Sequence, residues 1–225
     1  MYFCIEGIDG VGKSTQAAEL FKALENVYGA SNVVLTSEPG TTHSALTMEC
    51  RKLMLDARWE NEITADAREY VSQAARSVNL QNVVLPALAR KKIIIQDRGL
   101  LSGFAYGMAC GHSKTWLQTL ARKTCAPLMD FKKNVYDFVI VLTNHSVEGC
   151  LQRAKRSKTE FKAGDAIENR GSAFMNKVAD SMNRAKQEGF LDCELHYIDT
   201  TDKSIADVHA EILALVLCKV KLQYI

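Results

Sequence analysis

The chain has 225 residues, of which 28 are basic and 26 acidic, and 47% are hydrophobic. This length suffices for one large domain with a well-buried core. A formal charge of +2 argues against a general nucleic-acid binder, and the hydrophobic content excludes a disordered chain. The seven cysteines are scattered and contain no CxxC pair. They therefore predict idle thiols in a reducing cytoplasm, with neither a disulfide framework nor a zinc site.

The sequence contains no segment that indicates a transmembrane helix or a signal peptide. The best apolar runs, residues 138–142 and 212–216, are too short for a transmembrane helix. The N-terminus lacks the basic start and the extended apolar stretch of a signal peptide. We therefore expect a cytoplasmic protein.

Strand-like and helix-like segments alternate along the whole chain. The strand-like runs cover residues 2–6, 33–36, 93–97, 138–143 and 195–199. The helix-like stretches cover residues 14–28, 44–56, 65–90, 100–110, 113–124, 147–156, 172–187 and 204–218. This order predicts an α/β fold with a five-stranded parallel sheet and helices on both faces. Functional residues are then expected just after the strands, because ligands of such sheets bind at the carboxyl ends of the strands.

The segment after the first predicted strand has the pattern of a phosphate-binding loop. Residues 7–15 contain the full G-x4-G-K-[ST] motif between a strand and a helix. The glycines allow backbone N–H groups to point at phosphate oxygens, and the helix N-terminus adds partial positive charge. Lys13 is expected to reach the β- and γ-phosphates, and the Ser14 hydroxyl to ligate Mg²⁺. The predicted ATP-binding residues are Gly7, Asp9, Gly10, Val11, Gly12, Lys13, Ser14 and Thr15.

The remaining sequence narrows the chemistry that follows nucleotide binding. A GTPase switch protein requires an Asn-Lys-x-Asp motif, and here Asn176 and Lys177 are followed by Val-Ala. Motors and transporter ATPases usually need a longer chain. These exclusions leave a small phosphotransferase with two substrate pockets.

Further motifs follow the next two strands. Glu-Pro-Gly occupies residues 38–40, Ala-Ala-Arg occupies residues 74–76, and Asp97-Arg98 precedes Ser102 and Tyr106. These motifs, together with the opening segment (residues 3–16) and the segment around Arg51, resemble the motifs of the thymidylate kinases in their order and spacing. The resemblance is dense to about residue 107 and thinner after it.

This resemblance implies one nucleoside monophosphate kinase domain over residues 1–225, with a P-loop NTPase-type sheet. It implies transfer of the γ-phosphate of ATP to a deoxynucleoside monophosphate, with dTMP as the first expectation. A modified or broader set of pyrimidine deoxynucleotides is the alternative. Mg²⁺ is the implied cofactor.

The matching positions carry expected roles in binding the acceptor. Arg51 and Arg98 match the arginines that clamp the acceptor phosphate, for which bidentate contacts supply charge and orientation. Asp9 matches the carboxylate that reaches the sugar hydroxyl, Arg76 matches the arginine that hydrogen-bonds the base, and Asp97 is expected to hold Mg²⁺ through water. The expected acceptor-binding set is Asp9, Glu38, Arg51, Ser72, Arg76, Arg98, Ser102 and Tyr106. The expected metal-binding pair is Ser14 and Asp97.

The charged stretch of residues 153–170 resembles the lid of this family. The family takes a catalytic arginine from the phosphate loop or from the lid, and Gly10 and Val11 occupy the loop positions here. The lid is therefore expected to supply it, from Arg153 or Arg156, with Arg170 as a further candidate. Two acids, Asp165 and Glu168, match the lid, whereas Ala166 stands where an arginine is usual. The expected catalytic set is Lys13, Asp97, Arg98, Arg153 and Arg156.

Two positions depart from the family where the base is read. Ser72 replaces a phenylalanine that stacks on thymine, and such stacking is worth roughly 1–3 kcal/mol. Tyr70 and Phe104 are possible substitutes for that ring. Gly107 replaces the glutamine of bacterial members, and Gly99 replaces a larger residue after Arg98. The phosphate-handling residues are thus kept while the base-reading residues have diverged.

Three other functions remain as alternatives. A deoxynucleoside kinase would need no pair of arginines for an acceptor phosphate. A catalytically quiet nucleotide-binding module fits the departures but not the complete phosphate loop, and a nucleic-acid 5′-end kinase would need a basic groove. The apolar positions of the helix expected at residues 65–90 are compatible with a homodimer.

Overall fold

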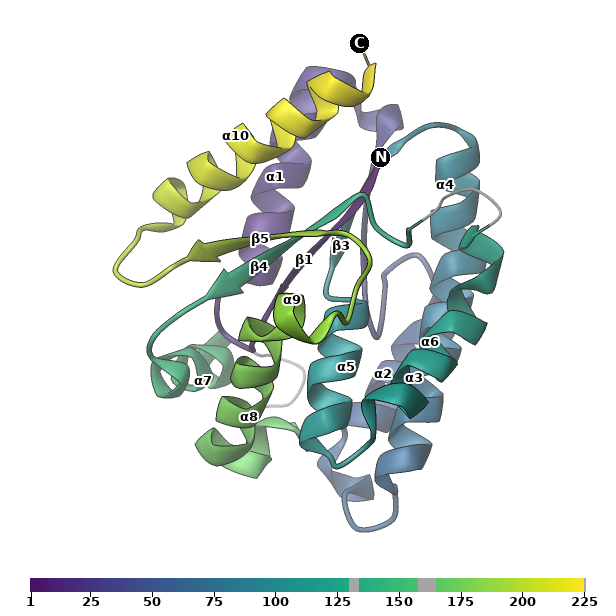
Figure 1. Cartoon of the computed structure of the whole chain (residues 1–225), viewed down its shortest axis with the longest axis vertical. Helices are drawn as coiled ribbons and strands as arrows, with labels where there is room; N and C mark the ends of the chain where they lie inside the picture. Colours follow the sequence, from purple (N-terminus) through teal and green to yellow (C-terminus); the bar gives the residue numbers. More distant parts are fainter. Residues whose placement is uncertain (130–133, 158–164, 225) are drawn as a thin grey trace.

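A five-stranded sheet forms the centre of the molecule (Figure 1). The structure is a computed structural model that describes residues 1–129, 134–157 and 165–224. All neighbouring strands are parallel, in the order β2-β3-β1-β4-β5. The strands are β1 (Tyr2–Gly7), β2 (Val33–Ser37), β3 (Ile93–Asp97), β4 (Phe138–Thr143) and β5 (Glu194–Asp199). The predicted α/β fold and the five predicted strands are confirmed.

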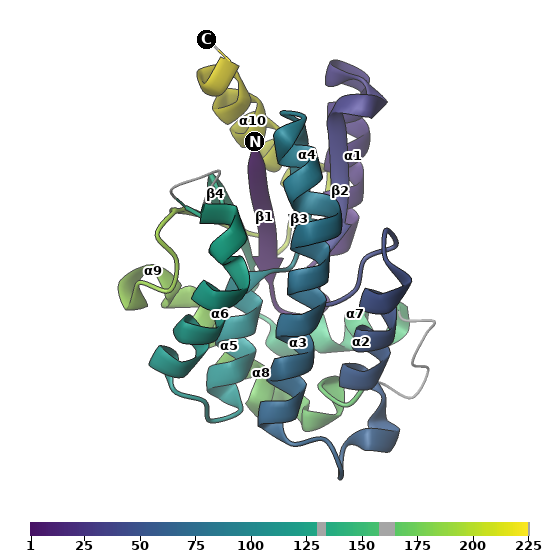
Figure 2. The ribbon, with the colours of Figure 1, turned by 90° about the vertical axis from the view of Figure 1, so that its right-hand side faces the viewer.

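Helices connect the strands and cover the sheet. They are α1 (Lys13–Tyr28), α2 (Ala45–Leu55), α3 (Ala65–Asn79), α4 (Leu85–Ala89), α5 (Leu100–Ala109), α6 (Lys114–Met129), α7 (Val147–Ser157), α8 (Gly171–Asn183), α9 (Ala185–Glu188) and α10 (Ile205–Tyr224). Helix α1 packs against α10, while α5, α6 and α3 pack against one another (Figures 1 and 2).

Four predicted helices differ from the observed ones. The one expected at residues 204–218 continues to Tyr224. The helix expected at residues 65–90 contains a π-helical turn, η3 (Leu80–Val84), just before Pro86. A proline cannot donate its own backbone hydrogen bond, and a π turn accommodates that loss within a continuing helix. The helix expected at residues 172–187 is divided at Arg184 into α8 and α9, and the one expected at 113–124 continues to Met129.

The hydrophobic core is built on the three central strands. Strands β1 and β4 are buried almost along their whole length, and Phe3 stacks on Phe138 where they pair, with ring centroids 4.8 Å apart. Strands buried on both faces need the continuous apolar runs seen in the sequence. The core thereby holds the loops that follow β1, β2 and β3 in fixed positions.

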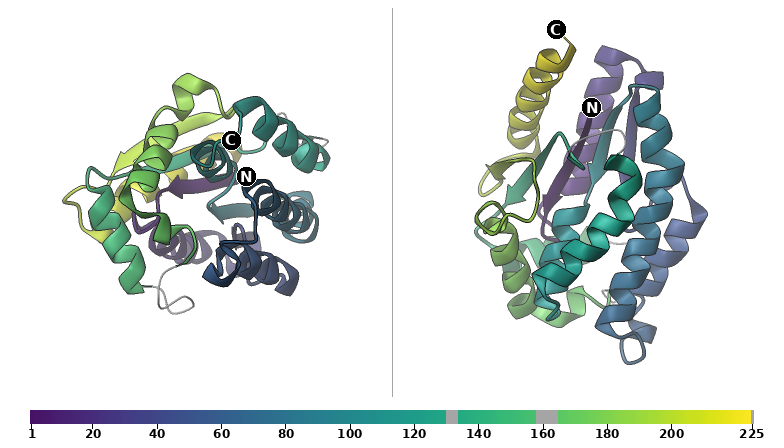
Figure 3. Two further views of the ribbon diagram at one scale, coloured as in Figure 1. Left: turned by 90° about the horizontal axis from the view of Figure 1, so that it is seen from below. Right: turned by 45° about the vertical axis from the view of Figure 1, so that its right-hand side comes forward.

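The carboxyl ends of the parallel strands meet at one edge of the sheet. The register places Ser37 opposite Asp97 and Ile5 opposite Asp97 on the two sides of β3. Helices α2 and α3 lie on one side of this edge, and α7 and α8 lie on the other (Figures 1 and 3). Among the described residues, no helix is both long and apolar enough to cross a membrane.

Candidate active site

A cavity of about 1190 Å³ lies along this edge of the sheet. It exceeds the roughly 300–1,000 Å³ typical of a pocket for one small ligand. Most of the predicted site residues line it, namely Asp9, Gly10, Val11, Gly12, Lys13, Ser14, Thr15, Glu38, Arg51, Ser72, Arg76, Asp97, Arg98, Ser102, Tyr106 and Arg153. Gly7 and Arg156 are not among the residues that line the cavity. The structure therefore brings together residues from distant parts of the sequence in one space large enough for two substrates.

The phosphate-binding loop has the backbone that its glycines allow. Gly7, Gly10 and Gly12 all have positive φ, and α1 begins directly after Gly12 with no side chain capping its N-terminus. The first N–H groups of α1 are thus available to an anion. Gly10 also packs so closely on the Cys150 carbonyl that a Cβ atom would collide with it. The loop is held against α7 at this point.

Lys13 is a buried cation at the start of α1. Its Nζ donates a hydrogen bond to the carbonyl of Ile8 at 2.7 Å. Burial lowers the pKa of Lys13 to about 8, and the neighbouring Arg98 adds to this effect, whereas Asp9 and Asp97 oppose it. A phosphate group bound in the loop would place negative charge beside the Lys13 ammonium group and would stabilise its charged form.

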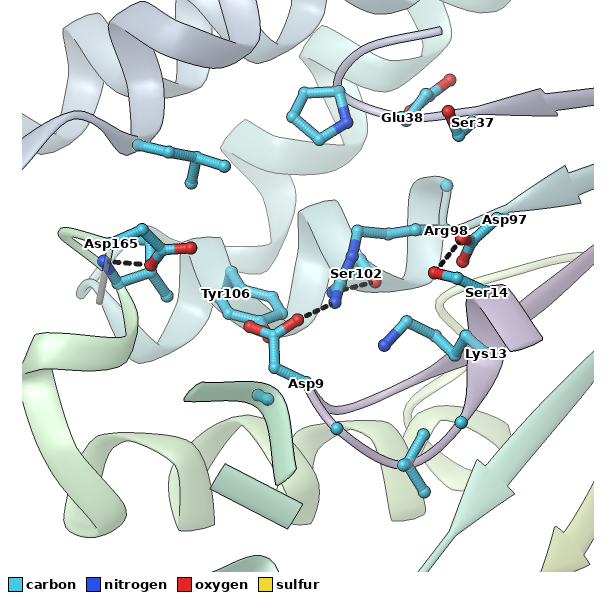
Figure 4. Close-up of a pocket in the computed structure, with 18 of the residues that line it drawn as sticks. Asp9, Lys13, Ser14, Ser37, Glu38, Asp97, Arg98, Ser102, Tyr106 and Asp165 are labelled. Atoms are coloured by element: carbon cyan, nitrogen blue, oxygen red, sulfur yellow. Dashed lines mark hydrogen bonds and ion pairs between the residues drawn. The ribbon is translucent and has the colours of Figure 1, made fainter. Parts of the chain in front are cut away.

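Ser14 and Asp97 form a pair of oxygen donors beside the loop. The Ser14 hydroxyl donates to Asp97 Oδ2 at 2.5 Å, and Asp97 Oδ1 is buried without a hydrogen-bond partner among the described residues (Figure 4). Hard oxygen ligands suit Mg²⁺, which keeps several waters and is held by one or two protein groups together with substrate phosphates. No cluster of three His, Cys, Asp or Glu side chains forms a metal site within the described ranges. The residues present fit a phosphate-bound Mg²⁺ ion.

Arg98 is the centre of a polar cluster on the side of the cavity where the acceptor is expected to bind. Its Nη1 donates to Ser102 Oγ at 2.9 Å, and its Nη2 donates to Asp9 Oδ1 (Figure 4). Tyr106 donates to the other Asp9 oxygen at 3.1 Å, and the Arg98 guanidinium lies 5.2 Å from the Tyr106 ring centre. The guanidinium is therefore fixed in one orientation inside the cavity.

Glu6 supports this cluster from below and was missed by sequence reasoning. It is fully buried and accepts hydrogen bonds from the backbone N–H groups of Gly99 and Ser102 and from the Ser102 hydroxyl. It thereby fixes the start of α5 against β1. A carboxylate inside an otherwise apolar strand is the signal that could have identified it.

The same side of the cavity also contains a buried ion pair. Arg76 Nε donates to Glu38 Oε2 at 2.8 Å, and both side chains are almost completely buried. Burial raises the pKa of Glu38, and the Arg76 cation opposes that rise. On the neighbouring wall, Gly40 lies against the Arg51 side chain, where a Cβ atom would approach it to 3.0 Å. The Glu-Pro-Gly segment thus contacts two of the arginines expected to bind the acceptor.

Arg153 is the arginine of the expected lid that reaches the phosphate loop. Its Nε donates to the Gly10 carbonyl at 3.0 Å, and its Nη2 contacts Cys150 Sγ at 3.0 Å. Arg156 is exposed, and Arg170 pairs with Glu60 at 3.0 Å.

The remaining lid positions lie partly outside the described residues. Residues 158–164 and the Glu168 side chain belong to that undescribed part. Asp165 lines the cavity, and the buried Ala166 donates its N–H to the Leu55 carbonyl at 2.9 Å. The end of the expected lid is thus attached to the end of α2.

Neither of the expected substitutes for the missing phenylalanine reaches the cavity. Tyr70 is half exposed and packs edge-on against Trp116, with ring centroids 5.8 Å apart. Phe104 is buried and stacks on Phe190 at 5.4 Å. The position of Ser72 therefore has no replacement ring from these two residues.

The divergent glycines have packing partners. A Cβ atom on Gly107 would lie 2.7 Å from Leu117 Cδ2, so α6 occupies the space of a side chain there. A Cβ atom on Gly99 would collide with the Tyr136 hydroxyl, which accepts a hydrogen bond from Gln96 at 3.3 Å. Both positions are explained by close packing of neighbouring elements.

The other end of the cavity is lined by a segment that sequence reasoning did not single out. It follows β5 and includes Thr200, Thr201 and Ile205. Gln16 on α1 donates to the Ile205 carbonyl at 2.9 Å, which joins this segment to the phosphate-loop helix. Ligands of parallel sheets bind at the carboxyl ends of the strands, and β5 is one of these strands. The same rule could therefore have identified the segment that follows β5.

The fold and the site together define a class of enzyme. A phosphate-binding loop and an arginine-lined pocket open into the same cavity at the carboxyl edge of a parallel sheet. This is the arrangement of a P-loop nucleoside monophosphate kinase, in which donor and acceptor phosphates meet.

Comparisons with known proteins identify the family. The family model described as "Thymidylate kinase" matches residues 5–212. The thymidylate kinase of Helicobacter pylori (strain HPAG1) is 33% identical over 223 residues, covering 98% of this chain and 100% of that protein. The thymidylate kinase of Sulfurimonas denitrificans is 33% identical over 214 residues, covering 95% and 97%. The chain belongs to the thymidylate kinase family.

A solved structure agrees with this assignment. The crystal structure of thymidylate kinase from Ehrlichia chaffeensis superposes with a TM-score of 0.69 at 25% identity. The match covers 96% of this chain and 98% of that one. The resemblance expected from the motifs is thus confirmed over nearly the whole length.

Proposed function

We propose that this protein transfers the γ-phosphate of ATP to dTMP, giving dTDP and ADP, with Mg²⁺ as cofactor. The observation that carries the proposal is the single cavity in which Lys13 and the Arg98 cluster face one another. In the reaction an oxygen of the acceptor phosphate attacks the γ-phosphorus. The bond from that phosphorus to the bridging oxygen breaks, and ADP leaves with the electron pair.

The residues of the cavity divide the work between the two substrates. Lys13 and the N–H groups of the loop would hold the donor phosphates, and Ser14 with Asp97 would hold the magnesium ion. Arg98 and Arg51 would clamp the acceptor phosphate, with Asp9 beside the sugar. The metal would neutralise charge on the transferring group.

Arg153 is the proposed lid arginine in this reaction. Its contact with the Gly10 carbonyl places it next to the loop position that lacks an arginine. Closure of residues 153–170 over the donor would bring positive charge to the transferring group and exclude water. Within the described residues, the start and end of this proposed lid contact the loop and α2, respectively.

Two further expectations remain part of the proposal. A cytoplasmic location is supported by the seven cysteines, all of which are free thiols. A homodimer is the proposed assembly, and the exposed apolar side chains Leu46, Leu53 and Tyr70 on α2 and α3 support it.

A substrate panel tests the proposed function. The purified protein with ATP and Mg²⁺ is expected to phosphorylate dTMP, and Lys13→Ala should abolish that turnover. Thymidine and a 5′-hydroxyl oligonucleotide serve as acceptors for the two rival kinases, and neither should accept phosphate. Turnover of thymidine but not dTMP would overturn the proposal, as would turnover of no nucleotide at all.

A further inference from the structure

Helix α3 carries a polar stripe on the face that meets the cavity. Glu69, Ser72, Gln73 and Arg76 stand at spacings of three and four residues, so they share one side of the helix. Glu69, Gln73 and Arg76 are more than 90% buried, and Glu69, Ser72 and Arg76 line the cavity. Buried polar groups without partners are costly, so such a stripe is unsuited to core packing. It is suited to a polar ligand.

The hydrogen bonds within the stripe leave groups without partners. Gln73 Nε2 donates to Glu69 Oε1 at 2.7 Å, whereas Gln73 Oε1 has no partner among the described residues. Arg76 uses its Nε for Glu38, and its Nη1 is also unpaired within that set. Glu69 lines the cavity, and a carboxyl group that accepts one hydrogen bond from Gln73 has lone pairs left for a second donor.

The opposite wall packs closely on the Arg76 end of the stripe, and the space beside the stripe lies at Ser72. Gly103 on α5 faces Arg76, where a Cβ atom would lie only 3.1 Å from Nη2. Ser72 is small, and Tyr70 and Phe104 point elsewhere. A base in this pocket is therefore contacted on the α3 side by hydrogen-bonding groups and not by the face of an aromatic ring.

Distance along α3 separates the two ends of the stripe. Glu69 precedes Arg76 by seven residues, which corresponds to about 10 Å along a helix axis. A pyrimidine ring bound to Arg76 needs a substituent to reach Glu69. Carbon 5 is the position that can carry one without altering the base-pairing edge, since it bears the methyl group of thymine in the major groove.

We propose that Glu69 is a specificity-determining residue that accepts a hydrogen bond from a hydroxyl or amine on the 5-substituent of the acceptor base. The enzyme then prefers a pyrimidine deoxynucleotide with such a substituent to dTMP. A methyl group cannot donate to a carboxylate, whereas a hydroxyl forms a charge-assisted hydrogen bond with it. Gln73 orients Glu69 through its amide N–H. This inference rests on the proposed monophosphate kinase activity.

The discrimination ratio tests this inference. The ratio is kcat/KM for 5-hydroxymethyl-dUMP divided by kcat/KM for dTMP, at saturating ATP. The native protein should favour 5-hydroxymethyl-dUMP by about tenfold or more, the effect of one hydrogen bond to a charged group. Glu69→Leu and Ser72→Phe should both lower the ratio, the second because a ring occupies the space and stacks on thymine. Glu62→Gln, an exposed acid just before α3, should leave the ratio unchanged.

The outcomes separate the inference from the proposed function. Equal or better use of dTMP by the native protein overturns the inference and leaves dTMP kinase activity in place, and so does an unchanged ratio in Glu69→Leu. Absence of turnover with every monophosphate overturns both. Glu69→Ala also removes the acceptor oxygens, so it provides the same comparison if Glu69→Leu fails to fold.

Discussion

Arg98 shows how one residue combines strain and electrostatics. Its φ of 67° lies in the left-handed region, which costs a non-glycine residue roughly 1–2 kcal/mol. The hydrogen bonds to Asp9 and Ser102 and the contact with Tyr106 offset that cost. Strained residues of this kind persist only where the surrounding contacts hold them in place, and they are concentrated at functional sites. The guanidinium is thereby held inside the cavity, where it is proposed to bind the acceptor phosphate.

The lowered pKa of Lys13 predicts that nucleotide affinity depends on pH. Its pKa of about 8 is lower than usual because it is buried. The ammonium form, which attracts phosphate, therefore dominates below pH 8 and is lost as the pH rises through that value. We expect the Kd of a non-hydrolysable ATP analogue to increase between pH 7 and pH 9. Isothermal titration calorimetry on the native protein and on Lys13→Arg measures this effect.

The arginine variant is the control for that titration. Arginine keeps its charge throughout this range, so Lys13→Arg should show a flat profile. An equally flat profile for the native protein would contradict the low pKa of Lys13.

Arg153 and Arg156 form a matched pair for locating the lid arginine. We expect Arg153→Ala to lower kcat by about 10³-fold or more, the range known for arginines that stabilise phosphoryl transfer. Arg156→Ala should have a much smaller effect because that side chain does not line the cavity. Steady-state kinetics with saturating ATP and dTMP measures both. A larger loss for Arg156→Ala would reverse the assignment.

At the scale of elements, the contact between α5 and α6 depends on one glycine. Alanine normally stabilises a helix interior by up to about 1 kcal/mol over glycine. At Gly107 the opposite is expected, because a Cβ atom would lie 2.7 Å from Leu117. We expect Gly107→Ala to reduce the free energy of unfolding by about 1–3 kcal/mol, the usual cost of overpacking. Urea denaturation measures the change.

A second substitution shows whether the clash is the cause. In a chain that already carries Leu117→Ala, the added Gly107→Ala should cost much less, because the space is then free. Equal costs in both backgrounds would mean that the contact with α6 is not responsible.

At the scale of the whole molecule, one cavity is expected to hold both nucleotides. A bisubstrate compound, with adenosine and thymidine joined through a polyphosphate chain, would contact both ends of it. At a concentration one hundred times its Kd, such a ligand adds about 2.7 kcal/mol of stability, or roughly 5–10 °C in Tm for a chain of this length. Thermal melting with Mg²⁺ measures the shift. With ATP and the compound at the same concentration, a shift no larger than that given by ATP would contradict a shared cavity.

Much of the fold and of the donor site is determined by the sequence itself. The five strands lie within one or two residues of their predicted bounds because buried parallel strands require short apolar runs, a local signal. The phosphate loop is equally local, since its glycines, Lys13 and Ser14 are adjacent in the chain. The π-helical turn before Pro86 could not be predicted in the same way. The spacing of apolar residues indicates a helix there, but it does not indicate a change in the backbone hydrogen bonds within that helix.

Only the tertiary structure decided which distant residues meet. Arg153 reaches the Gly10 carbonyl whereas Arg156 does not, although both belong to the same charged stretch. Gly107, where the sequence indicated a lost base contact, lines the cavity and also packs on Leu117, and Glu69 lines the cavity from α3. These outcomes depend on contacts between elements far apart in the sequence. Local propensity and spacing do not encode such contacts, because packing selects them only when the sheet and its helices assemble.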